Sequence, residues 1–569
     1  MPETKNQGGL FVTAFIFIVL SICYLLFSLH PLWNAEAMYA EVPREMLESK
    51  DFLYPTLNYA PFIFKPPLFF WTNALSIWLF GQHLGPRIPQ ALFAAGTVVF
   101  AYKIAARSSK TSGLMAAGVL ATSYGFVFHT AELLPDVPLG FLTTCAVYYF
   151  LKISDGKNRT FGLWASLGLA VMTKGFLGLI FPGIAFVVFI AAEGRRDMLK
   201  KLASIPAIAV FMAITAPWHI LMELRNPGFL YDFIINEQVL RFFNKRIPPD
   251  WDSISSPLFS LITLAWMMPW AVFLLQGARM AVRKRDANLR MALYWGLGGM
   301  VFLLLSSQKM EYYQIPLLPP LAILVGGYLA ALAEAVRPAS TGRPASGRAS
   351  LPPEAGLTTK PAAAGSILLL LMGAAGAAAA PFLFNKFSAD VPAHHGRILL
   401  YTAEACFLAI AAGGAAAFIF IRKGGIGKAF TAVLLIGIVL GAGSKPALDA
   451  LQPELSDAHL AKAAARFLKP GDPLVVQAHE EYEYSAVYCY YTRRKVLILR
   501  DGVNPMVPSV FNDGASFIIN NNEFRELWKS GARVFFAGSP DSSLLSAPSR
   551  VIYHASGAII CNTETSKRD

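Results

Sequence analysis

The chain has 569 residues, of which 55% are hydrophobic and only 15% are charged, and its mean hydropathy is +0.47. Soluble globular proteins carry about 25% charged residues, so this composition excludes an ordinary soluble enzyme and indicates an integral membrane protein. The net charge of +13 does not require a nucleic acid partner, because lysine and arginine accumulate in the cytoplasmic loops of multi-span membrane proteins.

Apolar runs predict a polytopic α-helical membrane protein with about thirteen spans between the N-terminus and residue 445. They lie near 9–30, 86–106, 112–128, 131–151, 161–174, 175–193, 203–222, 256–276, 290–307, 314–335, 364–384, 397–421 and 427–445. The first run has no small-residue cleavage site, so we expect a retained span rather than a signal peptide. Residues 66–81 are apolar but short and rich in aromatic residues, which predicts an interfacial helix.

The loops between these runs orient the chain. Basic residues gather in alternate loops, among them "YKIAARSSK", "EGRRDMLKK" and "ARMAVRKRDANLR". With thirteen spans, all of these loops lie on the side of the N-terminus, which the positive-inside rule makes cytoplasmic. The Pro/Ser/Gly-rich segment 336–362 then becomes a flexible cytoplasmic linker, and 31–85 becomes an outer loop with juxtamembrane helices.

The polar tail, residues 446–569, is expected to form a small α/β domain on the outer side. Strand-like runs alternate with helical stretches at 455–468 and 522–530; the strands are expected at 473–477, 495–500, 533–538 and 551–560. Cys489 and Cys561 lie in this domain, where an oxidising compartment would permit a disulfide. Both a disulfide and two free thiols remain open from the sequence.

Charged residues gather in the predicted outer loops rather than within the spans. A carboxylate there could remove a proton from an acceptor hydroxyl, and cations could stabilise charge on a departing phosphate. Glycosyl transfer from a lipid phosphate uses both. A transporter for a lipid-linked sugar is the alternative, and it would place charges or broken helices in the middle of the spans.

Several motifs follow one another in an order that resembles a known family. They are "YAEVPREMLESKDF", "KPPLFFWTNALSIWLFG", "RIPQAL", "LPDVPL", "VMTKGFLGLIFPG", "PWHILMELRNPGF", "EQVLRFF" and "KMEYYQIPLLPPLAIL". Together they resemble the bacterial aminoarabinose–lipid A transferases of the GT-C, protein-mannosyltransferase-like superfamily. The resemblance covers the chain to about residue 335, and "NNEFRELWKSGARVFFA" extends it to the tail. It implies the GT-C fold, a bacterial inner-membrane location with a cytoplasmic N-terminus, and a periplasmic C-terminal domain.

The resemblance also implies the reaction and its partners. We expect an inverting glycosyltransferase that moves a sugar from a polyprenyl-phosphate donor to lipid A or another envelope glycan. Protein Ser/Thr is an alternative acceptor, and a non-catalytic homologue that binds polyprenyl phosphate is an alternative function. The protein is expected to be a monomer that contacts membrane lipids and binds no nucleic acid.

Catalytic roles come from matching single positions. The family has an acidic pair in its first outer loop, and its first member, the usual base, aligns with Ala35. Glu36 aligns with the second member and is the nearest substitute, so we expect Glu36 to be the base, with Asp136 supporting it. A helix cap is the alternative role for Asp136.

The donor is assigned to other matching positions. Lys65 and Arg241 are expected to contact the phosphate, and Tyr313 is expected to line the lipid site. Arg87, Lys174 and Glu41 are further substrate-binding candidates.

Two family positions associated with a bound metal are changed. They are Phe64 and Asn236 here, and neither is a strong ligand for a transition metal, so no metal is expected at these positions, and a divalent metal elsewhere is the alternative.

Overall fold

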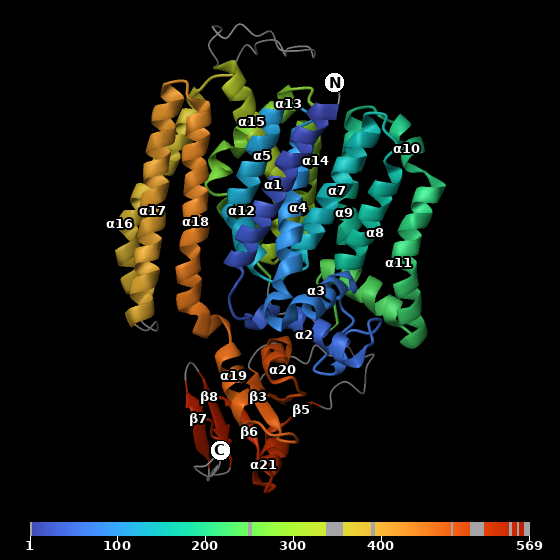
Figure 1. Ribbon diagram of the computed structural model, residues 1–569, viewed down its shortest axis with the longest axis vertical. Helices are drawn as coiled ribbons and strands as arrows, with labels where there is room; N and C mark the ends of the chain where they lie inside the picture. Colours follow the sequence, from blue (N-terminus) through green and yellow to red (C-terminus); the bar gives the residue numbers. More distant parts are fainter. Residues whose placement is uncertain are drawn as a thin grey trace.

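The computed structural model describes residues 3–247, 253–336, 357–387, 393–478, 482–500, 517–545, 549–554 and 557–562. Long helices form a bundle, and a small α/β domain lies against one end of it (Figure 1). The expected fold class is therefore confirmed.

The bundle helices follow the predicted apolar runs in chain order. The first half comprises α1 (Glu3–Phe27), α4 (Arg87–Ala105), α5 (Lys110–Thr122), α6 (Tyr124–Ala131), α7 (Asp136–Ser154), α8 (Thr160–Lys174), α9 (Leu177–Ala192), the short α10 (Asp197–Leu202) and α11 (Ile205–Arg225). The second half comprises α12 (Ser256–Trp266), η2 (Trp270–Phe273), α13 (Leu274–Arg283), α14 (Ala287–Leu305), η3 (Glu311–Leu317), α15 (Leu318–Ala335), α16 (Lys360–Phe387), α17 (Ala393–Arg422) and α18 (Ile426–Leu455).

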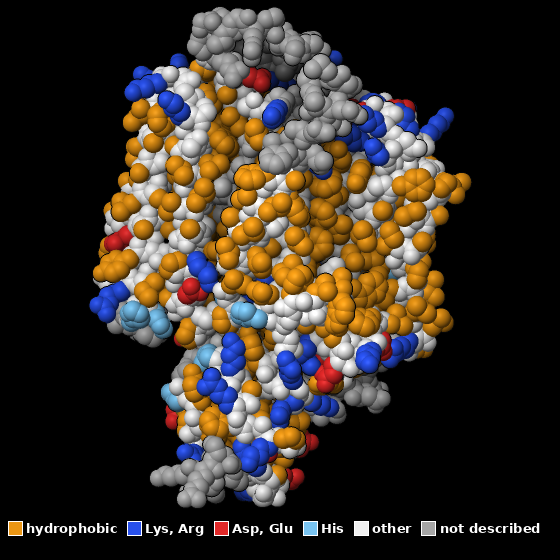
Figure 2. All heavy atoms as spheres, viewed as in Figure 1, with side chains coloured by type: hydrophobic (Ala, Val, Ile, Leu, Met, Phe, Trp, Pro, Cys, Tyr) orange, Lys and Arg blue, Asp and Glu red, His pale blue; other side chains and the backbone are white. Residues whose placement is uncertain are grey.

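Within the described residues, eight helices are long and apolar enough to cross a membrane, or ten if each of two bent pairs is one span. Two shorter apolar helices, Thr13–Phe27 and Leu177–Ala192, lie beside them. Thirteen spans thus stays a prediction. Hydrophobic side chains cover the flank of the bundle, while lysine and arginine lie mainly towards its two ends, as a membrane-spanning body requires (Figure 2).

Two predicted spans are broken. The α5–α6 pair bends by 55° at Ser123, and Ser256–Trp266 meets Trp270–Arg283 at 98°. After the first bend, α6 continues to Ala131. The next helix, α7, begins at Asp136, whereas the span was predicted to begin at residue 131. The segment between α6 and α7 is therefore a loop at one end of the bundle.

Two helices lie across the end of the bundle that faces the α/β domain (Figure 1): α2 (Asn34–Ser49) and α3 (Leu68–Leu84). The α3 helix exposes Trp78 and Leu75, as expected of an interfacial helix. The α2 helix is covered instead of lying on the membrane surface, because α3 packs on it from the bundle and α20 and η4 pack on it from the α/β domain. A short hairpin of β1 (Thr56–Leu57) and β2 (Ala60–Pro61) joins the two helices.

The α/β domain has one six-stranded sheet in the order β5-β4-β3-β6-β8-β7. The strands are β3 (Leu474–Ala478), β4 (Leu497–Arg500), β5 (Ile518–Ile519), β6 (Phe535–Gly538), β7 (Arg550–His554) and β8 (Ala558–Cys561). The first four strands in chain order pair in parallel, and β7 and β8 add an antiparallel edge. The helical elements are α19 (Ala458–Phe467), η4 (Tyr482–Ser485), α20 (Ala486–Thr492) and α21 (Asn521–Lys529).

The predicted strands and helices of this domain overlap observed elements, with several differences. The strand β5 was not predicted, and the strand expected at 551–560 is two strands, β7 and β8. The α18 helix runs on to Leu455, so the domain begins about ten residues later than 446. The short helix α20 was not predicted. Both Cys489 and Cys561 lie in the described part of the chain and are thiols, and the Cys489 Sγ donates to Asn58 Oδ1 at 3.4 Å.

Hydrogen bonds fix the α/β domain against the bundle. The Asn58 side chain pairs with both backbone groups of Val496, at 2.9 Å each. The Tyr490 hydroxyl donates to Gln82 O at 2.5 Å. This docking holds η4 beside α2, so a residue of the α/β domain reaches the interior described next.

Candidate active site

Two cavities meet beneath α2 and α3. An apolar cavity of about 270 Å³ is lined by side chains of α9, α14 and the segment around 240; these include Phe176, Leu177, Ile180, Val239, Phe242, Phe243, Phe302 and Leu303. A polar cavity of about 280 Å³ is lined by Trp33, Ala35, Glu36, Met38, Tyr39, Glu132, Arg246, Glu311 and Glu483, among others. Six residues line both cavities: Phe64, Lys65, Lys174, Glu237, Arg241 and Tyr313. We call these six residues the shared wall.

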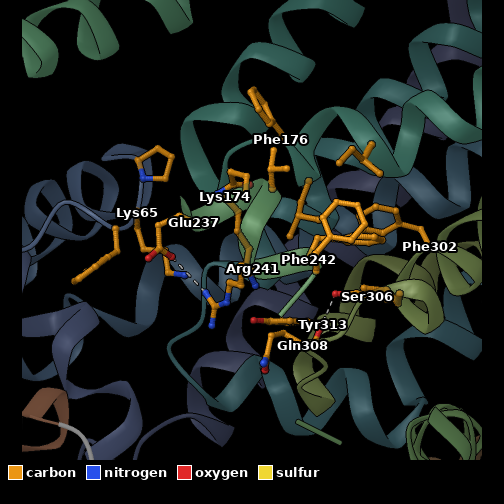
Figure 3. Close-up of a pocket in the computed structure, with 18 residues that line it drawn as sticks. Lys65, Lys174, Phe176, Glu237, Arg241, Phe242, Phe302, Ser306, Gln308 and Tyr313 are labelled. Carbon is orange, nitrogen blue, oxygen red and sulfur yellow. Dashed lines mark hydrogen bonds and ion pairs between the residues drawn. The ribbon is translucent and has the colours of Figure 1, made fainter. Parts of the chain in front are cut away.

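The shared wall is assembled from distant segments. Lys65 precedes Pro66 and Pro67, and α3 begins directly after them, so the prolines fix where the loop ends. Arg241 follows a ten-residue π-helix, η1 (Tyr231–Leu240), which contains Glu237; π-helical turns are frequent at functional sites. Figure 3 shows Lys65, Glu237 and Arg241 on one side of the apolar cavity and Phe242 and Phe302 on the other.

Lys174, the last residue of α8, is fixed by a buried ion pair. Its Nζ lies 2.6 Å from both carboxylate oxygens of Asp136, and it lies over the Tyr313 ring at 4.3 Å. Gly175 follows with φ +66°, and a Cβ there would lie 3.0 Å from the Gln238 side chain, so the turn requires glycine to approach η1 closely. Asp136 lies in the first turn of α7 and pairs with Lys174 rather than serving as a helix cap.

Positive charge exceeds negative charge at the shared wall. Glu237 binds Arg246 at 2.6 Å and lies 3.7 Å from Arg241. Burial and the neighbouring cations Arg241 and Lys174 lower the pKa of Lys65 to about 7. A lysine whose ammonium form is disfavoured by other cations would gain from an anion at this place, so the wall suits a phosphate.

Glu36 lies in the wall of the polar cavity, but its carboxylate is held by four N–H donors. Both terminal nitrogens of Arg87 donate to it, at 2.6 and 3.0 Å, and the backbone N–H groups of Trp33 and Leu133 donate at 3.0 and 2.6 Å. Burial opposes its ionisation, but Arg87 prevails and lowers the pKa of Glu36. A carboxylate so stabilised as an anion is a weak base. Arg87 contacts Glu36 and lines neither cavity.

Like Arg87 and Asp136, Glu41 lines neither cavity. Arg44 binds it with two hydrogen bonds of 2.7 Å, and the pair is buried between α2 and its surroundings. Glu41 thus forms an ion pair within α2, and its role as a substrate-binding residue stays a prediction. By contrast, Lys65, Lys174, Arg241 and Tyr313 are brought together as expected.

Sequence reasoning missed three carboxylates of the polar cavity: Glu132, Glu311 and, from the α/β domain, Glu483. Glu132 stands four residues before Asp136, in the same predicted outer loop, so its position was available from the sequence. Its orientation into the cavity depends on contacts with α2 and α4, which no local pattern reveals.

The two positions that the family associates with a metal do not form a metal site here. Asn236 hydrogen bonds to Asp232 and to both backbone groups of Ile247, so its amide holds the loop after η1. Phe64 packs edge-on against Phe62. Across the described residues, no group of three His, Cys, Asp or Glu side chains is placed to hold an ion. The residues present do not fit a transition metal, and no chemical step is derived through one.

Comparisons with known proteins agree with this architecture. A family model described as dolichyl-phosphate-mannose-protein mannosyltransferase matches residues 64–221. The undecaprenyl phosphate-alpha-4-amino-4-deoxy-L-arabinose arabinosyl transferase of Yersinia enterocolitica is 29% identical over 344 residues, which cover 58% of this chain and 60% of that protein. One of the same description from Proteus mirabilis is 30% identical over 329 residues, 55% and 58% of the two chains. The alignments thus span three fifths or less of these relatives.

Solved structures extend the likeness to almost the whole chain. The crystal structure of ArnT from Cupriavidus metallidurans bound to undecaprenyl phosphate matches with a TM-score of 0.79 at 21% identity, covering 97% of this chain and 98% of that one. Its apo form matches with a TM-score of 0.77 at 22% identity. The chain therefore has the fold of this ArnT, and its resemblance to the bacterial aminoarabinose transferases of the protein-mannosyltransferase-like superfamily is confirmed.

Proposed function

We propose that this protein is an inverting glycosyltransferase of the bacterial inner membrane. It takes a sugar from a polyprenyl-phosphate donor and attaches it to a cell-envelope acceptor, lipid A or another part of lipopolysaccharide. The observation that carries this proposal is the cationic shared wall between an apolar and a polar cavity. The relatives named above, whose descriptions contain undecaprenyl phosphate and an amino sugar, support the class of donor.

We place the donor across the two cavities. The apolar cavity takes the first isoprene units of the lipid between Phe242 and Phe302. The phosphate lies at the shared wall against Lys65 and Arg241, with Lys174 behind it. The sugar projects into the polar cavity, where Glu132, Glu311 and Glu483 would favour a sugar that carries an amino group.

Transfer in this arrangement is a single displacement. The acceptor oxygen attacks the anomeric carbon from the face opposite the phosphate, and the bond from that carbon to the phosphate oxygen breaks. The electron pair leaves with the phosphate, and the cations of the shared wall stabilise the developing charge. Asp136 keeps Lys174 in position for this. Glu36 as the base stays a prediction, and its four N–H partners favour a positioning role.

The orientation belongs to the same proposal. The N-terminus and the basic loops that include Arg107 and Arg195 lie at the end of the bundle opposite to α2 and α3 (Figure 1). We place that end in the cytoplasm and the α/β domain in the periplasm. Reporter fusions after residue 445 and at the N-terminus test this, because only a periplasmic fusion of alkaline phosphatase is active.

The decisive experiment compares lipid A by mass spectrometry from strains with the protein, without it, and with a Lys65→Met/Arg241→Met variant. A sugar-sized mass increase that requires the unaltered protein supports the proposal. Unchanged lipid A, together with no transfer by the purified protein from any polyprenyl-phosphate sugar, would refute it. Binding of undecaprenyl phosphate without transfer would identify a non-catalytic homologue, and a mass increase on protein Ser/Thr would reassign the acceptor.

A further inference from the structure

Glu132 faces the polar cavity from the loop between α6 and α7. The backbone N–H of Leu133, the residue after Glu132, donates to the carboxylate of Glu36 at 2.6 Å. Glu132 therefore lies close to Ala35, the residue before Glu36, and this is the position at which the related family has its catalytic carboxylate. We propose that Glu132 is the general base of the transfer and that His129 positions it. This inference rests on the proposed function.

The backbone on both sides of Glu132 is held in place. Arg87 donates to Ala131 O at 2.7 Å, and Glu36 accepts from Leu133 N, so one buried ion pair brackets the residue. Gln90 donates to the carbonyl of Glu132 itself at 2.6 Å. Glu36 and Arg87 therefore act through Glu132: they fix the loop that presents its side chain to the cavity.

His129 supplies the remaining restraint. Its Nδ1 lies 2.5 Å from Glu132 Oε2, and its ring packs edge-on against Trp266 with centroids 4.9 Å apart. The imidazole is fully buried, and its Nε2 meets no hydrogen-bond partner within the described part of the chain. The hydrogen bond uses one carboxylate oxygen of Glu132 and leaves Oε1 for the hydroxyl of an acceptor.

Two other carboxylates near the cavities are bound to cations. Both oxygens of Asp136 bind Lys174, and Glu237 binds Arg246. The partner of Glu132 is a histidine instead. Burial raises the pKa of Glu132, and the negative charges of Glu36 and Glu311 raise it further. His129 lowers it, but the net shift is upward. A carboxylate whose pKa is raised accepts a proton more readily, which is what a general base requires.

The step balances within the cavity. The acceptor hydroxyl gives its proton to Glu132 Oε1 while its oxygen bonds to the anomeric carbon, and the phosphate departs with the electron pair of the broken bond. Glu132 ends protonated and the phosphate ends with one more negative charge. Release of that proton to water resets the base.

The test uses the full-length protein in nanodiscs, with undecaprenyl phosphate-linked 4-amino-4-deoxy-L-arabinose as donor and lipid A as acceptor. Glu132→Gln should lower kcat by about 10²–10⁴ and leave the binding of undecaprenyl phosphate unchanged. The kcat/KM of the unaltered protein should fall as the pH falls through the pKa of Glu132; we call this decrease at low pH the acid limb. Glu132→Gln should show no acid limb. His129→Asn, which retains a donor near Nδ1, should keep more kcat than His129→Leu.

Competing assignments have their own variants. Glu526→Gln, on the exposed face of α21, is the control for a glutamate lost elsewhere. If Glu132→Gln keeps kcat within threefold, or if Glu36→Gln or Glu311→Gln alone removes the acid limb, the assignment is overturned. If the unaltered protein transfers no sugar from any polyprenyl-phosphate donor, the proposed function fails and this assignment fails with it; activity that survives in Glu132→Gln rejects the assignment alone.

Discussion

Lys65 should make donor binding depend on pH. Its pKa of about 7 follows from burial and from the neighbouring cations Arg241 and Lys174. A sugar-linked polyprenyl phosphate is a diester with one negative charge that does not titrate near neutrality, so Lys65 is the group whose protonation changes on binding. The phosphate favours the ammonium form and raises its pKa in the complex.

The sign and size of the effect follow from this shift. Below pH 7 Lys65 is already protonated, and the donor binds with full affinity. Above pH 7 the site must first take up a proton, so the dissociation constant rises by up to about tenfold per pH unit. Between pH 6 and pH 9 the donor should therefore bind up to about 100-fold more weakly, until the pKa of Lys65 in the complex is reached.

The assay is donor binding to the nanodisc protein from pH 6 to pH 9, followed by KM over the same range. Lys65→Arg should bind with a nearly flat profile, because a guanidinium does not deprotonate in this range. Lys245→Arg, at an exposed position near the end of η1, should keep the slope of the unaltered protein. A flat profile for the unaltered protein, or an unchanged slope in Lys65→Arg, would refute the reasoning.

Three further changes test the supporting structure. Arg87→Met leaves Glu36 as a buried charge and should cost about 3–5 kcal/mol of unfolding free energy, seen as a lower melting temperature in detergent; equal melting temperatures would show that the pair is not structural. Asp136→Asn should weaken the fixation of Lys174 and lower kcat/KM by about tenfold or more, whereas unchanged kinetics would contradict its supporting role. Asn58→Ala should speed hydrogen exchange at the docked face of the α/β domain, since two hydrogen bonds to Val496 are lost; identical exchange would place the restraint elsewhere.

Local patterns were sufficient for most of the elements. Apolar runs located the bundle helices, and alternating β-rich segments located the strands of the tail. The break at Ser123 was not predicted, because the apolar run predicts one span, although Thr122, Ser123 and Gly125 interrupt it and glycine and serine often accompany kinks. Trp270 Nε1 donates to Thr122 Oγ1 and Tyr124 N donates to Met268 O, so tertiary contacts hold the break.

In the site, too, some features followed from sequence motifs and others depend on tertiary contacts. Motif resemblance selected Lys65 and Arg241, which do meet at the shared wall although 176 residues separate them. It also selected Glu36, whose charge is used to hold Arg87, a residue 51 positions away. Whether an acid in a loop is a base or an anchor depends on which cation reaches it, and that is a property of the packed bundle rather than of the loop.

The charges at the shared wall favour the products of transfer over the bound donor. Among the residues of the shared wall, three cations, Lys65, Lys174 and Arg241, face one carboxylate, Glu237, so the wall carries two surplus positive charges when Lys65 is protonated. The donor brings one negative charge, whereas the phosphate that departs gathers a second during the reaction. Binding that strengthens as this charge develops lowers the barrier rather than only holding the substrate. Because the pKa of Lys65 is about 7, its protonation adjusts the surplus, and the wall is best matched to the transition state when Lys65 is charged and Glu132 is not yet protonated. These two requirements oppose each other across the pH scale, so transfer should have a maximum between the pKa of Glu132 and that of Lys65 in the complex.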